Sequence, residues 1–163
     1  MSKQCALRIF VVDDELLIAS TLTVILRKSG YMVMSFTNPL EAMRCALVDV
    51  PDLLISDVIM TELSGVELAL EMRRTCPECD ILLLSGLAYA EDLLMEARAQ
   101  GHAFQILCKP VHPTEILRWV HEHARRHERL NAGRPCSCTV AGVSLMSMDS
   151  PRSTFPSRGA LAV

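Results

Sequence analysis

The chain has 163 residues and a formal net charge of −3; half of its residues are hydrophobic and only 4% are aromatic. This composition predicts one domain with an aliphatic core. No apolar run reaches about 18 residues and the N-terminus is not basic-then-apolar, which argues against a membrane span and a signal peptide and predicts a cytoplasmic protein. The basic residues form no continuous stripe, so we expect neither nucleic acid nor a membrane as a partner.

Short apolar runs alternate with longer segments of helical periodicity. The runs predict strands over 7–12, 31–36, 53–56, 81–84 and 104–108. The longer segments predict helices over 15–29, 39–48, 65–75, 90–100 and 113–130. A strand followed by a helix, five times over, predicts an α/β fold with a parallel sheet and helices on both of its faces. The strands are nearly continuous in aliphatic residues, as expected when both faces are covered.

Turn and cap residues stand at the ends of several predicted helices. These residues are Gly30, Gly101, Asn38-Pro39 and Pro113. From Asn131 onward the helical periodicity ends, and Ser, Thr, Pro and Gly make up 14 of the last 33 residues. We therefore expect residues 1–130 to form the domain and residues 131–163 to form a disordered tail.

Seven cysteines are scattered along the chain, and this odd, irregular set does not predict a disulfide framework. Cys76 and Cys79 form a C-x-x-C motif that follows a predicted helix, whereas a redox motif normally opens a helix. A zinc site that joins them to Cys136 and Cys138 is a second alternative. We favour reduced structural thiols over both.

The last predicted helix carries an inward apolar stripe, and Trp119 falls beside it. The stripe consists of Ile116, Leu117, Val120 and Ala124. The functional interpretation places Trp119 in a signalling face, as an anchor for a partner or for a second copy in a homodimer. The structural interpretation has it cover a neighbouring helix. His123 and His127 have i, i+4 spacing, but no third metal ligand accompanies them.

Polar residues follow four of the predicted strands. Asp13 and Asp14 follow the first strand in "VVDDE", and Asp57 follows the third in "LLISD". Ser85 follows the fourth in "LLLSG", and Lys109 follows the fifth in "ILCKP". The carboxyl ends of parallel strands share one edge of a sheet, where ligands bind, so we expect these side chains to converge.

This set of side chains has a specific chemistry, although each motif alone would be an ordinary cap or turn. Clustered carboxylates need a cation, and their hard oxygens suit Mg²⁺. A lysine and a hydroxyl group suit the oxygens of a phosphoryl group. A remaining aspartate could be the nucleophile that forms an aspartyl phosphate. The sequence therefore predicts a combined metal and phosphoryl site.

The motifs "VVDDE", "DVIM" with Gly65, "LLLSG" and "CKP" resemble the receiver domain of bacterial two-component response regulators. The resemblance covers residues 6–130. It implies a doubly wound, flavodoxin-like sheet of five parallel strands with strand order 2-1-3-4-5. It also implies phosphoryl transfer from a phosphohistidine on a sensor histidine kinase or on a phosphotransfer protein.

The resemblance assigns roles to the acidic residues. It implies that Asp57 is the phosphoacceptor and that Asp13, Asp14 and Asp57 bind Mg²⁺. The backbone carbonyl of Ile59 is implied as a further ligand. This chain has Thr61 where the family usually has a proline after methionine, which loosens that loop without changing the chemistry.

The resemblance also assigns Ser85 and Lys109 to the phosphoryl oxygens and implies a cis Lys109–Pro110 peptide. The family usually has Tyr or Phe three residues before the lysine, as a rotamer switch partnered to the hydroxyl. Here Ile106 occupies that position, and Phe104 is the nearest aromatic residue. The usual switch is therefore in question.

Two classes of function fit these residues. The first is a phosphoacceptor that signals by phosphorylation-dependent binding to a downstream protein or to a second copy. The second is a metal-dependent phosphatase or phosphotransferase with an aspartate nucleophile. Such enzymes usually carry a second Asp two residues after the nucleophile, where this chain has Ile59. A pseudo-receiver that binds partners without phosphorylation is disfavoured, because the acid set is complete.

Two aliphatic residues flank the expected phosphoryl group. Ile59 lies two positions past the acceptor, and Leu87 lies two positions past the hydroxyl. Neither side chain can orient or deprotonate a water, so we expect a long-lived phosphorylated state.

Overall fold

The computed structural model describes residues 7–86 and 89–131, and in these ranges five strands alternate with five helices. The strands are β1 (Arg8–Val12), β2 (Met32–Phe36), β3 (Leu53–Asp57), β4 (Asp80–Ser85) and β5 (Gln105–Cys108). The helices are α1 (Leu16–Lys28), α2 (Pro39–Ala46), α3 (Gly65–Thr75), α4 (Tyr89–Ala99) and α5 (Pro113–Asn131). The predicted tail and Leu87 lie outside the described residues.

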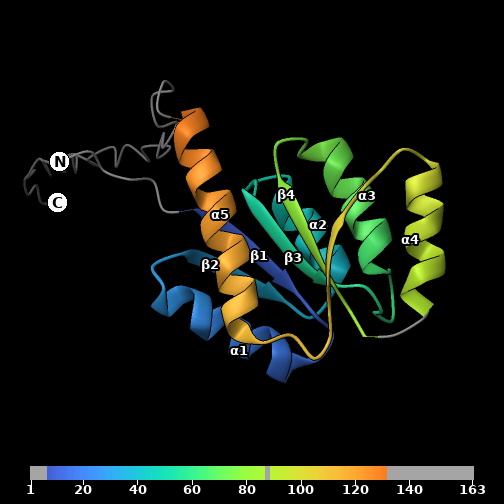
Figure 1. The fold of residues 1–163 in the computed structure, drawn as a ribbon, viewed down its shortest axis with the longest axis horizontal. Helices are drawn as coiled ribbons and strands as arrows, with labels where there is room; N and C mark the ends of the chain where they lie inside the picture. Colours follow the sequence, from blue (N-terminus) through green and yellow to red (C-terminus); the bar gives the residue numbers. More distant parts are fainter. Residues whose placement is uncertain (1–6, 87–88, 132–163) are drawn as a thin grey trace, which may run out of the picture.

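The strands form one parallel sheet with the order β2-β1-β3-β4-β5. Helices α1 and α5 cover one face of the sheet, and α2, α3 and α4 cover the other (Figure 1). The predicted fold class and strand order are confirmed. None of the helices in the described ranges is long and apolar enough to cross a bilayer.

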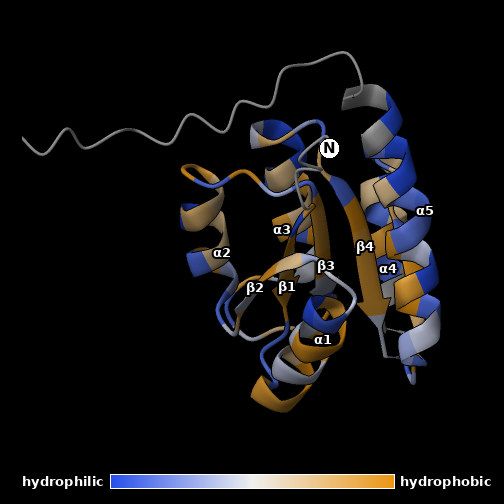
Figure 2. Cartoon of the chain, turned by 90° about the vertical axis from the view of Figure 1, so that its left-hand side faces the viewer, coloured by the Kyte–Doolittle hydropathy of each residue, from blue (hydrophilic) through white to orange (hydrophobic). Residues whose placement is uncertain are grey.

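The core consists of two apolar layers, one on each face of the sheet. Alternate residues of β1 supply both layers, with Phe10 on the side of α3 and Ile9 on the side of α5. Both side chains are completely buried. Figure 2 shows this pattern as hydrophobic central strands beneath helices with mixed surfaces. Full burial of one such side chain stabilises the fold by about 2 kcal/mol.

The two edge strands differ from this pattern. In β2 only Val33 is buried, and no residue of β5 is fully buried. The expectation that both faces of every strand are covered is therefore wrong at the edges, because the helices pack over the middle of the sheet. Arg27 of α1 reaches the β2 edge and donates hydrogen bonds to the Val33 carbonyl from Nε at 3.1 Å and from a terminal nitrogen at 2.6 Å.

The predicted cap residues are found at helix ends. Gly30 and Gly101 have φ values of 91° and 85°, a conformation that favours glycine, after α1 and α4 respectively. Asn38 caps α2, since its Oδ1 accepts the N–H of Leu40 at 2.8 Å. Pro113 is the first residue of α5.

Candidate functional site

The predicted acidic residues lie together at the carboxyl end of the sheet. Asp13 follows β1 directly, and Asp57 is the last residue of β3. The carboxylate oxygens of Asp13, Asp14 and Asp57 lie within 4.8 Å of one another. Within the described ranges, no other three acidic, histidine or cysteine side chains meet in this way. The structure thus brings together the three carboxylates that the sequence predicted.

Lys109 links two of these carboxylates. Its Nζ lies 3.1 Å from Oδ2 of Asp13 and 3.1 Å from Oδ2 of Asp57. Burial alone would lower the pKa of Lys109, but hydrogen bonds to Asp57 and Asp13 outweigh burial and raise the pKa. The side chain is therefore a fixed positive charge at neutral pH, which suits the oxygens of an anion.

The cluster has more negative than positive charge. Asp13 is 1% exposed and Asp57 is 8% exposed, whereas Asp14 is exposed. Burial raises the pKa of Asp57, and this effect, with repulsion from Asp13, outweighs the opposing effect of Lys109. Burial therefore raises the pKa of Asp57 more than repulsion from Asp13 does. The positive charge of a bound cation would offset both effects, because it stabilises the ionised carboxylate.

The donor set fits a divalent cation. The Oδ1 atom of Asp13 accepts the backbone N–H of Glu15 at 2.9 Å, which orients the carboxylate. Two mostly buried carboxylates beside an exposed one give hard oxygen ligands with access to water. Mg²⁺ prefers such an arrangement, because it binds one or two carboxylates and keeps several waters.

The loop between β3 and α3 depends on a glycine. The N–H of Gly65 donates to the carbonyl of Val58 at 2.9 Å, and the N–H of Val58 donates to the carbonyl of Leu84 at 2.9 Å. A Cβ atom at position 65 would overlap the carbonyl oxygen of Asp57. Glycine therefore allows α3 to start against the end of β3. Ile59 lies on this loop, with its residue surface 50% exposed.

Ser85 is the last residue of β4 and is 7% exposed. The N–H of Lys109 donates to the carbonyl of Ser85 at 2.6 Å, which holds the end of β4 beside the lysine. The Lys109–Pro110 peptide is cis, as predicted. All five residues predicted for the site therefore lie at, or just after, the ends of four neighbouring strands.

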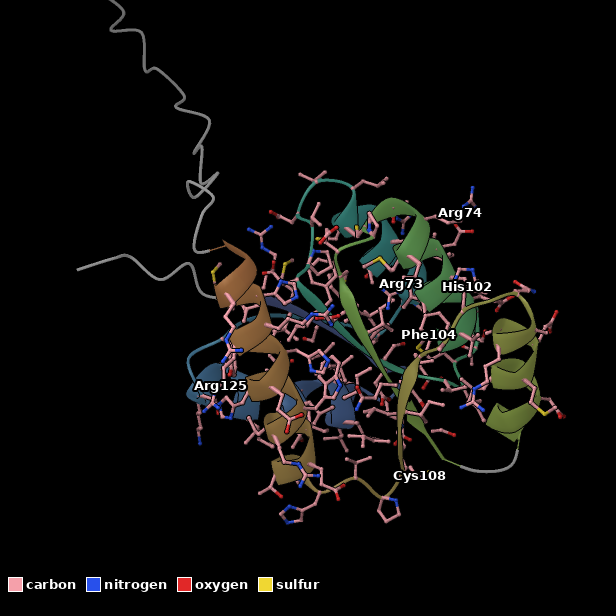
Figure 3. All side chains as sticks on the ribbon, turned by 45° about the horizontal axis from the view of Figure 1, so that its top comes forward. Arg73, Arg74, His102, Phe104, Cys108 and Arg125 are labelled. Atoms are coloured by element: carbon pink, nitrogen blue, oxygen red, sulfur yellow. The ribbon has the colours of Figure 1, made fainter. Side chains whose placement is uncertain are left out.

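Phe104 does not take the place of the missing aromatic switch. It is 8% exposed, packs in the core beneath α3 and α4, and stacks on His102 with ring centroids 6.3 Å apart. Cys108, not Phe104, pairs with Ser85 in the sheet, and Figure 3 shows these two labelled residues at opposite ends of β5. Ile106 lies between them and is partly buried.

Trp119 is 4% exposed and belongs to the core, so the interpretation that makes it an anchor for a partner or a second copy is wrong. Its Nε1 donates to Oε1 of Gln105 at 2.7 Å, and its ring stacks on His123 with centroids 4.0 Å apart. The predicted inward stripe of α5 lies in the same core layer. His127 contacts Asp80 at 3.1 Å, so the two histidines have structural contacts.

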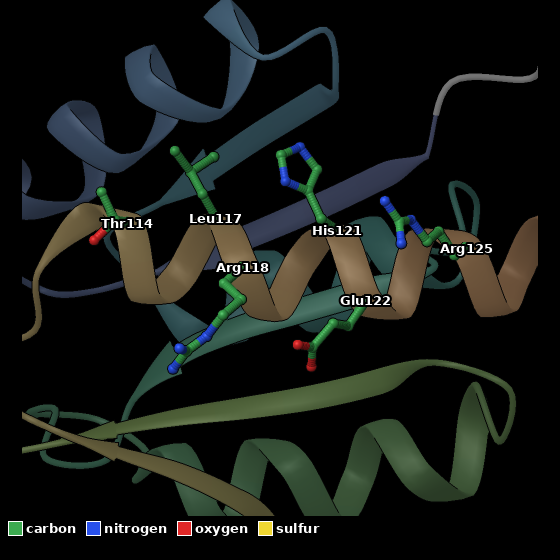
Figure 4. Close-up of a pocket in the computed structure, with 6 residues that line it drawn as sticks. All are labelled: Thr114, Leu117, Arg118, His121, Glu122 and Arg125. Atoms are coloured by element: carbon green, nitrogen blue, oxygen red, sulfur yellow. The ribbon is translucent and has the colours of Figure 1, made fainter.

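The other candidate sites carry no such chemistry. Cys76 and Cys79 are buried free thiols, and burial raises the pKa of Cys79 far above its usual range, which makes it inert. A hollow of about 370 Å³ lies along α5, lined by that helix alone. Figure 4 shows Leu117 and His121 pointing to one side of the helix and Arg118 to the other, so the hollow is not enclosed.

Comparisons with known proteins agree with this arrangement. Residues 9–121, more than half of the chain, match the family described as "Response regulator receiver domain". Nodulation protein W of Bradyrhizobium diazoefficiens is 32% identical over 146 residues, which are 88% of this chain and 62% of that protein. The alkaline phosphatase synthesis transcriptional regulatory protein PhoP of Bacillus subtilis is 32% identical over 121 residues, which are 74% of this chain and 50% of that protein.

Solved structures agree as well. A response regulator receiver domain protein from Clostridium thermocellum is 26% identical, with a TM-score of 0.67 over 77% of this chain and 99% of that one. The chain belongs to the family of response regulator receiver domains. It is thus a phosphoacceptor signalling domain of two-component systems rather than a classical enzyme, and the phosphatase alternative is not favoured. Receiver domains of this family are phosphorylated by histidine kinases and generally bind Mg²⁺ at an acidic pocket.

Proposed function

We propose that Asp57 is the residue that receives the phosphoryl group, with Lys109 and Ser85 as the groups that bind its oxygens. The observation that carries this proposal is the ammonium of Lys109, 3.1 Å from both Asp13 and Asp57 in a largely buried cluster. A lysine in this position can follow the negative charge when that charge moves from the carboxylate to the phosphoryl oxygens.

Asp13, Asp14 and Asp57, with the backbone carbonyl of Ile59, are the proposed ligands of Mg²⁺. The close approach of the three carboxylates supports this set. When bound, Mg²⁺ would supply positive charge that offsets the charge on the phosphoryl oxygens. The protein contributes the buried carboxylates and the orientation of Asp13 by the Glu15 N–H.

The proposed reaction is a displacement at phosphorus. A carboxylate oxygen of Asp57 forms the new P–O bond while the P–N bond of a phosphohistidine breaks. The electron pair of that bond remains on the imidazole nitrogen, which then takes a proton from water. Lys109 donates to one phosphoryl oxygen, and the hydroxyl of Ser85 donates to another. The donor is a sensor histidine kinase or a phosphotransfer protein.

The chain would also govern the lifetime of its own phosphoryl group. Ile59 is half exposed at the rim of the acid cluster and offers no polar atom to a water in line with phosphorus. Slow dephosphorylation therefore follows from its aliphatic side chain. Leu87 was predicted to act with it but lies outside the described residues.

Signalling would proceed by phosphorylation-dependent binding to a downstream protein or to a second copy of the chain. Residues 1–130 would form the receiver unit. The chain spans about half to three-fifths of the length of the two relatives described above, so the activities of those whole proteins are not carried over.

One experiment tests the proposal directly. The full chain is treated with a small-molecule phosphodonor, with and without Mg²⁺, and the aspartyl phosphate is located by mass spectrometry. We expect one Mg²⁺-dependent phosphoryl group on Asp57. A label on another residue would overturn the assignment, and continuous turnover of the donor at a fast rate would revive the enzyme alternative.

A further inference from the structure

A polar contact joins the loop that follows β2 to the loop that follows β3. The Nδ2 atom of Asn38 donates to Oε2 of Glu62 at 2.7 Å. Asn38 lies just after β2, whereas Glu62 lies in the loop between β3 and α3. Strands β2 and β3 are the two neighbours of β1, the strand that Asp13 follows.

The same asparagine is fixed on its other side. Its Oδ1 accepts the N–H of Leu40 at 2.8 Å and so caps α2. One amide group therefore anchors a helix with its oxygen and holds a loop with its nitrogen. This fixed orientation makes Asn38 a rigid support, because the capping bond restricts the rotation of the side chain.

The loop that Asn38 holds runs from Val58 to Ser64. Its start is fixed by the bond from Val58 N–H to Leu84, and its end is fixed by the capping box of Ser64 with Glu67. Met60 packs into the core between these ends. Among the described residues, Asn38 makes the one side-chain hydrogen bond from another element to the middle of this loop. Thr61, unlike a proline, leaves the backbone there free to rotate.

We propose that Asn38 and Glu62 form a positioning clamp for the metal-binding loop. The inference rests on the proposed function, in which the Ile59 carbonyl of this loop binds Mg²⁺. By tying Glu62 to the start of α2, the clamp fixes the loop that follows Asp57 before the cation binds. Loss of the clamp lets the loop move, so cation binding must then order it and the affinity falls.

The test compares variants that separate the effect of the Asn38–Glu62 hydrogen bond from the effect of the negative charge on Glu62. Asn38→Ser keeps a capping oxygen for α2 but is too short to reach Glu62. Glu62→Ala removes the acceptor, whereas Glu62→Gln keeps an acceptor of the same length without the charge. Glu71→Ala, which removes an exposed carboxylate paired with Arg74 on α3, controls for the loss of one negative charge.

Mg²⁺ affinity of each full-length variant is measured by titration calorimetry, and folding without Mg²⁺ is checked by thermal melting. We expect roughly fivefold weaker binding for Asn38→Ser and Glu62→Ala, no greater loss in the double variant, and near-normal binding for Glu62→Gln and Glu71→Ala. Normal binding by Asn38→Ser would overturn the clamp. Equal losses in Glu62→Gln and Glu62→Ala would also overturn it, in favour of a charge effect. A wild type that binds no Mg²⁺ would instead overturn the proposed metal site, and the clamp with it.

Discussion

The two ends of the central sheet both carry charged clusters, but the clusters differ in charge balance. At the carboxyl end, three carboxylates lie together and the ammonium of Lys109 contacts two of them, those of Asp13 and Asp57. At the amino end, Asp80 contacts His127 at 3.1 Å and Arg126 at 3.9 Å. The buried Asp57 thus has too little positive charge beside it, whereas the partly buried Asp80 has enough.

The two aspartates have opposite pKa shifts as a result. Burial raises the pKa of Asp57, and Lys109 does not outweigh it. Burial would also raise the pKa of Asp80, but His127, His123 and Arg126 together lower it. The comparison teaches that burial alone does not distinguish a ligand site from a structural ion pair. The uncompensated negative charge at Asp57 does distinguish them, because a bound cation can offset it.

The first prediction is the loss of phosphorylation when the carboxyl-end aspartate is replaced. Asp57→Ala and Asp57→Asn should reduce Mg²⁺-dependent labelling by at least about 100-fold, because the nucleophile is removed. Asp80→Asn should be labelled like the wild type, since its charge has only structural contacts. Equal labelling of the Asp57 and Asp80 variants would break the distinction between the two ends. Phosphate-affinity gel electrophoresis of the purified chains measures the phosphorylated fraction of each variant.

The second prediction concerns the cation. Mg²⁺ at ten times its dissociation constant should add about 1.4 kcal/mol to the free energy of unfolding. For a chain of this size the melting temperature should rise by about 3–6 °C. Asp13→Ala should reduce this rise. Asp80→Asn should lower the melting temperature without Mg²⁺ but show the same rise when Mg²⁺ is added. An unchanged melting temperature in millimolar Mg²⁺ would count against a metal site at the carboxyl end.

The third prediction concerns the rim of the phosphoryl site. Ile59→Asn should speed dephosphorylation about fivefold, because a polar side chain can position water, although it is not a strong base. Val50→Asn is a matched control, since Val50 is 53% exposed at the amino end and Ile59 is 50% exposed. Release of phosphate from the purified phosphoprotein is followed over time. Equal rates in wild type and Ile59→Asn would show that this side chain does not set the lifetime.

The fourth prediction uses pH to isolate the amino end. The hydrogen bond to Asp80 raises the pKa of His127 in the folded state, although burial opposes the rise. The stabilisation is therefore complete below the unfolded pKa of about 6.5 and is lost as pH rises through the higher folded pKa. Relative to His127→Gln, the wild type should be more stable by about 1 kcal/mol near pH 6.

That stability difference should shrink near pH 9, as measured by urea unfolding of both chains at each pH. A difference that stays constant between the two conditions would mean that protonation of His127 does not stabilise this contact. The pKa of Asp80 is lowered in the folded state, so the ionised carboxylate also stabilises the fold. This stabilisation is lost only in acid, as pH falls through the folded pKa of Asp80.

Much of the carboxyl-end site could be predicted from the sequence. Asp13, Asp57 and Lys109 each follow a run of aliphatic residues, and the geometry of a parallel sheet brings such positions together. Apolar runs and helical periodicity predicted the five strands and five helices, and the convergence of the site follows from their order. This prediction needed no knowledge of side-chain contacts, because backbone topology alone sets where strand ends lie.

The remaining features depend on contacts between residues far apart in the sequence. Asn38 and Glu62 are 24 positions apart, and Asp80 and His127 are 47 positions apart. No local periodicity marks either pair. The burial of Trp119 was also undecided, because a residue beside an apolar stripe turns inward only if the neighbouring strand offers a partner. Here Gln105 of β5 accepts its N–H.

The contact from Arg27 to β2 has a consequence for the behaviour of the protein in concentrated solution. An open edge strand is a template onto which further strands can add, and repeated addition produces cross-β fibrils. The guanidinium of Arg27 donates two hydrogen bonds to the carbonyl of Val33, the second residue of this strand. An incoming strand would have to displace that group or bury its charge. A single arginine on α1 therefore opposes fibril growth from this edge.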